Sequence, residues 1–155
     1  MLNEKVSKLL NEQIMKELYS AYLYLDMSNY YSDEGLEGFE NWFYVQTQEE
    51  MDHAMLFRRY MLNNGEKITP LPIDAPQEQY KDFSAPLDKS LEHEQFVTAS
   101  INDIFSAAVE AKDYRTMEFL NWFIKEQAEE EKNASDLIQR FELFGSDAKG
   151  LYGMG

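Results

Sequence analysis

Residues 65–85 read GEKITPLPIDAPQEQYKDFSA, and this segment constrains how the rest of the chain can be connected. It contains Pro70, Pro72 and Pro76 and has little helical pattern, which predicts a long irregular loop. Loops of this length are uncommon inside a compact domain, so we expect this one to have a structural purpose. The sequence on either side of it indicates what that purpose is.

Long segments with helical periodicity lie on both sides of the loop, and no alternating strand pattern of Val, Ile and Thr competes with them. We therefore expect an all-α fold. The predicted helices are about Asn3–Ser32, about Leu36–Asn63, residues 84–111, and Tyr114–Gly145.

Capping and breaking residues mark the ends of these segments. Asp33-Glu34-Gly35 ends the first helix and Asn64-Gly65 ends the second. Ser84 is the predicted N-cap of the third helix, with Pro86 in its first turn, and Asp113 is the predicted cap of the fourth.

The lengths of the connections determine the topology. The first and third connections are only a few residues long, so each joins an antiparallel pair of helices. A helix of about 28 residues is about 42 Å long, whereas 21 extended residues reach about 69 Å. The second connection can therefore cross the whole bundle. We predict four helices in an up, down, down, up arrangement with a long crossover between the second and third.

Composition limits the function classes. The 155-residue chain is long enough for one domain with a continuous core, and it contains no cysteine, which excludes disulfides, thiolate metal sites and iron–sulfur clusters. The net charge of −15 disfavours nucleic acid and anionic lipid and favours cations as partners. No apolar run is long enough to span a membrane and no secretory signal is evident, so we expect a cytoplasmic protein.

Each predicted helix carries a stripe of residues at alternating spacings of three and four, the face that a bundle helix turns inward. Each stripe contains a carboxylate near its middle: Glu17, Glu50, Glu94 and Glu130. Burying four unpaired carboxylates costs several kcal/mol each or forces their protonation, unless cations lie between them. This pattern favours a metal site inside the bundle.

Two short motifs add further ligands to the acids. Glu50 and His53 lie at i and i+3 on one helix face, and Gln127 and Glu130 repeat this spacing on the fourth helix. Carboxylates with one imidazole suit iron or manganese and also bind zinc, whereas an oxygen-rich set without cysteine argues against copper(I). The residues themselves favour iron without excluding manganese or zinc.

At this level of detail the sequence resembles the bacterial-type non-haem ferritins over nearly its whole length, to about Tyr152. The matching motifs are Glu17-Leu18-Tyr19-Ser20 with Tyr24, then Gln48-Glu49-Glu50-Met51-Asp52-His53, His93-Glu94, and Trp122 leading into Glu126-Gln127-Ala128-Glu129-Glu130. The resemblance implies a ferritin-like four-helix bundle with a dinuclear iron site.

The resemblance also implies roles for individual residues. Glu17, Glu50 and His53 would bind one iron, and Glu50 would bridge to a second iron held by Glu94 and Glu130, with Gln127 close by. Tyr24 would lie beside this ferroxidase centre. Glu49, Glu126 and Glu129 match a third iron position, although neighbouring acids on helices also commonly form a solvated face.

Three neighbouring side chains invite other interpretations. Bacterioferritins use a methionine at the position of Met51 to bind haem between subunits. This chain has Gln127-Ala128-Glu129-Glu130 where bacterioferritins repeat Glu-x-x-His, so we expect no haem. We expect His93 to lie on the surface, and Trp122 is compatible with ordinary bundle packing.

The function that the resemblance implies is oxidation of Fe(II) by dioxygen, or by hydrogen peroxide, and storage of the ferric product as mineral. It also implies a homo-oligomeric shell of 24 subunits. We expect residues 1–145 to form the bundle domain and residues 146–155 a short tail. Ferritins of this kind continue into a fifth helix at the fourfold contacts, which we expect to be absent here, and this leaves shell closure open.

Two other functions are compatible with a helical bundle. A rubrerythrin-like peroxide reductase normally carries a rubredoxin module with cysteines, and this chain has none. A noncatalytic helical protein that binds metal passively differs from a ferroxidase in one measurable respect, which is oxygen consumption when Fe(II) is added.

Overall fold

A computed structural model describes residues 1–144 and confirms the predicted all-α fold. Its four helices are α1 (Glu4–Asp33), α2 (Glu37–Asn63), α3 (Ala85–Glu110) and α4 (Tyr114–Phe144). The described residues contain no strand. The predicted end of the last helix at Gly145, the tail 146–155 and the expected absence of a fifth helix concern residues outside the described part.

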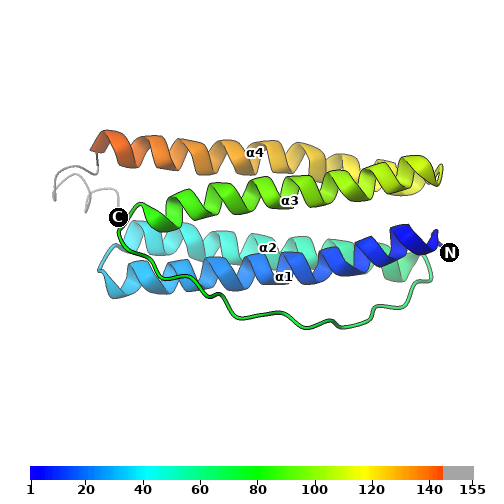
Figure 1. Cartoon of the computed structure of the whole chain (residues 1–155), viewed down its shortest axis with the longest axis horizontal. Coiled ribbons are helices and arrows are strands. Elements are labelled where there is room, and N and C mark those ends of the chain that lie inside the picture. The colour runs from blue at the N-terminus through cyan, green and yellow to red at the C-terminus, as the bar shows by residue number, and fades with distance from the viewer. Residues whose placement is uncertain (145–155) are drawn as a thin grey trace.

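The helices form an elongated bundle in which α1 and α2 are antiparallel, as are α3 and α4 (Figure 1). The crossover leaves the end of α2 near the N-terminus, runs along the length of the bundle beside α1 and enters α3 at the opposite end. The up, down, down, up topology is therefore confirmed. None of the described helices is long and apolar enough to cross a membrane.

The crossover is attached to α1 along its course. The Asn11 amide donates to the Thr69 carbonyl at 2.9 Å and accepts from the Thr69 backbone N–H at 2.8 Å. Near the other end, the Tyr31 hydroxyl donates to the Phe83 carbonyl at 2.6 Å. These contacts give hydrogen-bond partners to backbone groups of a segment that forms no helix or strand.

Three of the predicted helix starts can be compared with the capping contacts. The Asn3 side chain accepts from the backbone N–H groups of Lys5 and Val6, and the Asp113 side chain accepts from that of Thr116 at 3.0 Å. The prediction for Ser84 was wrong in its contact. Ser84 occupies the N-cap position but its hydroxyl donates to Asp82, whose carboxylate accepts the Ala85 N–H at 2.9 Å. The Asp82 side chain, two residues before Ser84, is longer than that of serine and therefore reaches the first turn of α3.

The two breaks with glycine are tight turns. Gly35 has φ of +74° and Gly65 has φ of +75°, a left-handed conformation that glycine adopts without steric cost. The third connection places a side-chain-bearing residue, Lys112, at φ of +55°. All three connections reverse or redirect the chain just after a helix ends.

The apolar core consists of two clusters, one on each side of a polar layer. One cluster includes Leu10, Phe57 and Ile101, and the other includes Leu23, Phe43 and Leu137. In every helix the buried carboxylate lies between members of the two clusters. The four carboxylates that the stripes place inside the bundle, Glu17, Glu50, Glu94 and Glu130, are all buried. Polar groups in the middle of the bundle are thus enclosed by apolar packing at both ends.

Candidate metal centre

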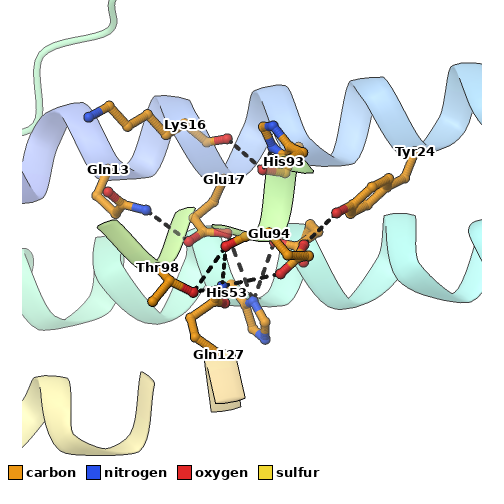
Figure 2. A network of polar contacts seen from close by, with 11 residues as sticks. Gln13, Lys16, Glu17, Tyr24, His53, His93, Glu94, Thr98 and Gln127 are labelled. Carbon is orange, nitrogen blue, oxygen red and sulfur yellow. Dashed lines mark hydrogen bonds and ion pairs between the residues drawn. The ribbon is translucent and has the colours of Figure 1, made fainter. Parts of the chain in front are cut away.

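The buried polar side chains of the four helices meet at mid-length (Figure 2). Two groups have potential ligand atoms that all lie within 4.8 Å of one another: Glu17 with Glu50 and His53, and Glu50 with Glu94 and Glu130. We call them the histidine triad and the carboxylate triad. All five residues are buried, and Glu50 belongs to both triads. The structure therefore brings together five of the residues that the sequence selected as ligands.

The histidine triad is held by α1 and α2. His53 Nδ1 lies 3.4 Å from Glu50 Oε2 and 3.8 Å from Glu17 Oε2. The ring meets Trp122 and Phe123 edge to face, with centroids 5.6 and 5.9 Å away. These aromatic contacts orient the imidazole so that Nδ1 points at the two carboxylates.

Several ligand atoms of this triad have no hydrogen-bond partner. Among the described residues, the buried side-chain atoms without one are Glu17 Oε2, Glu50 Oε1, Glu50 Oε2 and His53 Nδ1. Unsatisfied polar atoms are rare in folded proteins because each costs about 1–3 kcal/mol. Three of these atoms, Glu17 Oε2, Glu50 Oε2 and His53 Nδ1, lie close together, as the ligands of one cation would.

The carboxylate triad is held differently, because Glu94 already accepts hydrogen bonds at both oxygens. The Tyr24 hydroxyl donates to Glu94 Oε1, and Gln127 Nε2 donates to Glu94 Oε2 at 3.2 Å. Gln127 also lies 3.2 Å from the Thr98 hydroxyl, which in turn contacts Glu131 at 2.6 Å. Tyr24 and Gln127 therefore hold the Glu94 carboxylate in place.

Burial and mutual repulsion set the protonation of the acids. Burial, with the charge of Glu17, raises the pKa of Glu50 well above its usual range. Burial raises the pKa of Glu94 to about 7, and burial with the charge of Glu94 raises that of Glu130 to about 9. A divalent cation reverses this preference by stabilising the ionised carboxylates.

Glu17 and His53 behave as a pair. Burial opposes ionisation of both groups. Their close approach, with Glu17 Oε2 3.8 Å from His53 Nδ1, and their opposite charges outweigh burial, so the pKa of Glu17 is lowered and that of His53 is raised. Glu17 is thus the member of the cluster that most readily carries the negative charge.

The three acids predicted for a third iron position lie at the edge of the centre. Glu49 and Glu126 are half-buried and Glu129 is exposed. Within residues 1–144 they do not form a further tight group of ligand atoms. A pocket of about 300 Å³ outside His53 is lined by Glu49, Asp52, His53, Leu56, Trp122 and Glu126. The charges of Glu49 and Glu126 help to raise the pKa of Glu130, so both acids lie near the centre.

The expectation that His93 lies on the surface was wrong. The ring is 7% exposed, and its Nε2 lies 2.7 Å from the Ser20 hydroxyl on α1. It packs among Tyr19, Tyr24 and Phe96. Burial lowers the pKa of His93 to about 4, so the imidazole is neutral near pH 7. Helical spacing places His93 at the edge of the inward face of α3, and side chains of α1 cover it there.

The other two neighbours of the centre have exposed side chains. Trp122 is 48% exposed while one edge of its ring system contacts His53. Met51 is 43% exposed and lines an apolar pocket on the opposite side of α2 from His53. Whether haem binds at Met51 stays a prediction.

One group of contacts was not anticipated from the sequence. Gln13 Nε2 donates to Glu17 Oε1 at 3.0 Å, and Ser100 on α3 donates to Gln13 Oε1 at 2.6 Å. Gln13 is buried on the same face of α1 as Glu17. Its position one helical turn before Glu17 is the feature of the sequence from which this contact could have been predicted.

A metal fits this donor set chemically. Five oxygen-bearing or imidazole side chains with no thiol, arranged as two triads with a shared carboxylate, match the preferences of hard and borderline divalent cations. The family model for the ferritin-like domain matches residues 7–144, which include every one of these side chains.

The chain belongs to the ferritin family.

Similar proteins support this membership over nearly the full length. The chain is 38% identical to a probable bacterial non-heme ferritin-like protein of Haemophilus influenzae, covering 98% of this chain and 92% of that one. It is 37% identical to the bacterial non-heme ferritin of Campylobacter jejuni, covering 98% and 91%. The resemblance proposed from the sequence motifs is confirmed.

Solved structures give the same result for the fold. An open pore ferritin of the archaeon Archaeoglobus fulgidus superposes with a TM-score of 0.96 at 37% identity, covering 99% of this chain and 95% of that one. The ferritin-like bundle predicted from connection lengths is therefore confirmed. Membership in the family supports a function in iron storage.

Proposed function

We propose that this ferritin is a ferroxidase as well as a storage subunit, oxidising two Fe(II) ions with dioxygen at the paired triads. The observation that carries the proposal is the set of four buried, unpartnered ligand atoms on Glu17, Glu50 and His53, which lie beside a second carboxylate triad. Such an arrangement is costly without cations and favourable with two of them.

Each residue has a defined part in this proposal. Glu17 and His53 bind the first Fe(II), Glu94 and Glu130 bind the second, and Glu50 bridges them. Tyr24 and Gln127 hold Glu94 in position through their hydrogen bonds. Each Fe(II) gives one electron, and dioxygen takes both electrons and two protons to become hydrogen peroxide. Holding both ions together makes this two-electron step possible in one encounter.

The acids near the mouth of the centre extend the proposal to a third iron position. Glu49 and Glu126 line the pocket outside His53, and Glu129 lies about two turns beyond Trp122 on α4. Their negative charge favours movement of iron between the centre and the surrounding acidic surface. The ferric product then accumulates as mineral.

Mineral storage requires an enclosed volume, which we propose is a cytoplasmic shell of 24 identical subunits. An apolar face on α1, α2 and the crossover supports assembly, because the single chain leaves it uncovered. It forms a pocket of about 370 Å³ lined by Leu18, Ala21, Tyr22, Leu25, Thr47, Met51 and Ile73. Exposed apolar patches of this kind mark interaction surfaces. Sedimentation velocity of the purified protein measures the assembly directly.

The ferroxidase proposal is tested by adding Fe(II) anaerobically to the apo-protein, admitting oxygen and following ferric absorbance and oxygen consumption. We expect rapid oxidation up to about two irons per chain, followed by slower loading beyond that ratio. Glu50→Ala removes the shared ligand and is expected to abolish the rapid phase.

Glu37→Gln is the matched control, because it neutralises an exposed glutamate on the same helix α2. It should oxidise iron as the wild type does. Equal slow rates in the wild type and Glu50→Ala, with no oxygen consumed beyond the uncatalysed rate, would leave passive metal binding as the function. Binding of two irons without oxidation would have the same consequence.

A further inference from the structure

A hydrogen-bonded chain extends from the histidine triad towards the surface between α1 and α3. Lys16 Nζ donates to Ser100 Oγ at 3.0 Å, Ser100 Oγ donates to Gln13 Oε1 at 2.6 Å, and Gln13 Nε2 donates to Glu17 Oε1 at 3.0 Å. Gln13 and Glu17 are both fully buried. Figure 2 shows the Gln13 amide directed at the Glu17 carboxylate.

The direction of donation along this series of hydrogen bonds is set at its outer end, by Lys16. An ammonium group can only donate, so Lys16 occupies the acceptor side of the Ser100 hydroxyl and leaves its proton for Gln13. Gln13 must then present its carbonyl to Ser100 and its amino group to Glu17. Without a donor at Ser100, the amide could turn over and place its oxygen against the carboxylate.

The consequence falls on one oxygen of Glu17. Gln13 holds Oε1, whereas Oε2 has no partner and points to the same place as His53 Nδ1. A carboxylate fixed in this way presents a single oxygen to a cation at a defined angle. Hydrogen bonds to metal-binding groups commonly determine both ligand orientation and affinity.

We propose that Gln13 is a positioning residue for the metal ligand Glu17, and that Lys16, through Ser100, sets the orientation of the Gln13 amide. The proposal rests on the proposed function, because it assigns Glu17 to a metal. It concerns the histidine triad alone, since neither Gln13 nor Ser100 has a hydrogen bond to Glu94 or Glu130 among the contacts of the described residues.

A second glutamine gives a matched comparison within the same bundle. Gln46 on α2 is buried and lies four residues before Glu50, just as Gln13 lies four residues before Glu17. Both oxygens of Glu50 are without a hydrogen-bond partner, so Gln46 does not hold them. Gln46→Leu therefore makes the same change of side chain, at the same spacing from a ligand, without breaking such a contact.

The experiment titrates anaerobic apo-protein with Co(II) and records its visible ligand-field absorption together with the binding isotherm. The Co(II) equivalent whose spectrum is lost in Glu17→Gln reports the histidine triad. Gln13→Leu should weaken that equivalent about tenfold and change its absorption bands, while the other equivalent changes less than about twofold. Gln46→Leu should leave both equivalents at their wild-type affinities.

The outer members of the chain are tested in the same titration. Ser100→Ala and Lys16→Met should each weaken the same equivalent by about threefold, because Gln13 then keeps its place but loses its fixed orientation. Ser90→Ala is the control for Ser100→Ala, because Ser90 is another buried serine of α3, bonded only to the Leu87 carbonyl. It should have no effect on either equivalent.

Two results would overturn the positioning role. In one, Gln13→Leu binds both equivalents with wild-type affinity and spectrum. In the other, Gln13→Leu weakens both equivalents equally while lowering the thermal unfolding temperature of the apo-protein, which indicates a general packing role. If wild-type protein itself binds no Co(II) near two per chain, the proposed function fails together with this inference. The wild-type titration therefore separates the two failures.

Discussion

The two triads share Glu50 but differ in how ready they are for a cation. In the histidine triad, Glu17 Oε2, both Glu50 oxygens and His53 Nδ1 have no hydrogen-bond partner within residues 1–144. In the carboxylate triad, Glu94 accepts from both Tyr24 and Gln127. A cation entering the first meets ligand atoms without hydrogen bonds, whereas a cation entering the second meets a carboxylate that is already held by hydrogen bonds.

Protonation separates Glu17 from the acids of the carboxylate triad. The pKa of Glu17 is lowered, because the charge of the neighbouring His53 outweighs burial. The pKa values of Glu94 and Glu130 are raised to about 7 and about 9, mainly by burial. At neutral pH Glu94 and Glu130 must therefore release protons to bind a cation, whereas Glu17 is already ionised. The pKa values of Glu50, which both triads share, and of His53 are raised as well. The comparison teaches that two neighbouring sites that share a carboxylate can differ in protonation and in hydrogen bonding.

The largest expected effect comes from removing one ligand from each triad separately. Glu17→Gln should weaken the tighter of two Zn(II) equivalents by about a hundredfold or more, and Glu130→Gln should do the same to the weaker one. Isothermal titration of the apo-protein measures both. If the two substitutions weaken the same equivalent, the triads do not act as separate sites and the comparison fails.

The next effect is the pH dependence of the weaker equivalent. Because Glu130 has a pKa of about 9 and Glu94 of about 7, Zn(II) must displace a proton from Glu130 below pH 9 and from Glu94 below pH 7. Affinity should fall by about tenfold per pH unit between pH 9 and 7, and more steeply below pH 7. Zn(II) titrations across this range, with proton release measured in weak buffer, check the slope. A flat profile would contradict the raised pKa values.

A smaller effect concerns the stability of the apo-protein. The usual carboxyl pKa of 4.5 is raised to about 9 for Glu130 in the folded state. Between these values the folded state keeps a proton that the unfolded state releases, so stability falls as pH rises through this window. Glu130→Gln has no such proton to lose. Its unfolding temperature should exceed that of the wild type by an amount that grows from pH 5 to 9, on the order of a few degrees.

The same comparison includes its own controls. Addition of Zn(II) should reverse the trend in the wild type, because the bound cation stabilises the ionised carboxylates. Glu37→Gln, which alters an exposed acid, should follow the wild type at every pH. If the difference in unfolding temperature between Glu130→Gln and the wild type stays constant from pH 5 to 9, the substitution acts through packing and Glu130 does not hold a proton in the folded state.

The smallest expected effect comes from Tyr24→Phe, which removes one hydrogen bond from Glu94. That hydrogen bond lowers the pKa of Glu94 against the effect of burial, so its loss raises this pKa further. The weaker Zn(II) equivalent should lose about two- to threefold in affinity at pH 7 and regain it at higher pH. The tighter equivalent should not change. Equal losses at both would show that Tyr24 acts on the whole centre.

Much of the fold could be predicted from local patterns. The periodicity that identifies the helices and the glycines that end them act over one or two turns, so both are readable in the sequence. The topology followed from chain length, because the loop after Gly65 is long enough to cross the bundle. Glu17, Glu50 and Glu94 lie on inward stripes for the same local reason, and all three are buried.

Predictions failed where a contact depended on a neighbouring helix. His93 follows Glu92 and precedes Glu94, so its position on the helix is at the margin of the buried face, and the proximity of Ser20 on α1 decides its burial. Ser84 was expected to cap α3, but the conformation of the crossover brings Asp82 to that task. Neither the burial of His93 nor the capping of α3 can be predicted from spacing along one segment.

The sequence by itself determined which side chains face the interior, since spacings of three and four fix direction around a helix, and it identified the family through its motifs. Only the tertiary structure decided how these side chains pair. The distances between helices determine that Gln13 and Ser100 hold one oxygen of Glu17, that Tyr24 and Gln127 hold Glu94, and that burial protonates Glu130. Hydrogen bonds and desolvation act between segments far apart in the chain, so they are defined only once the helices have packed.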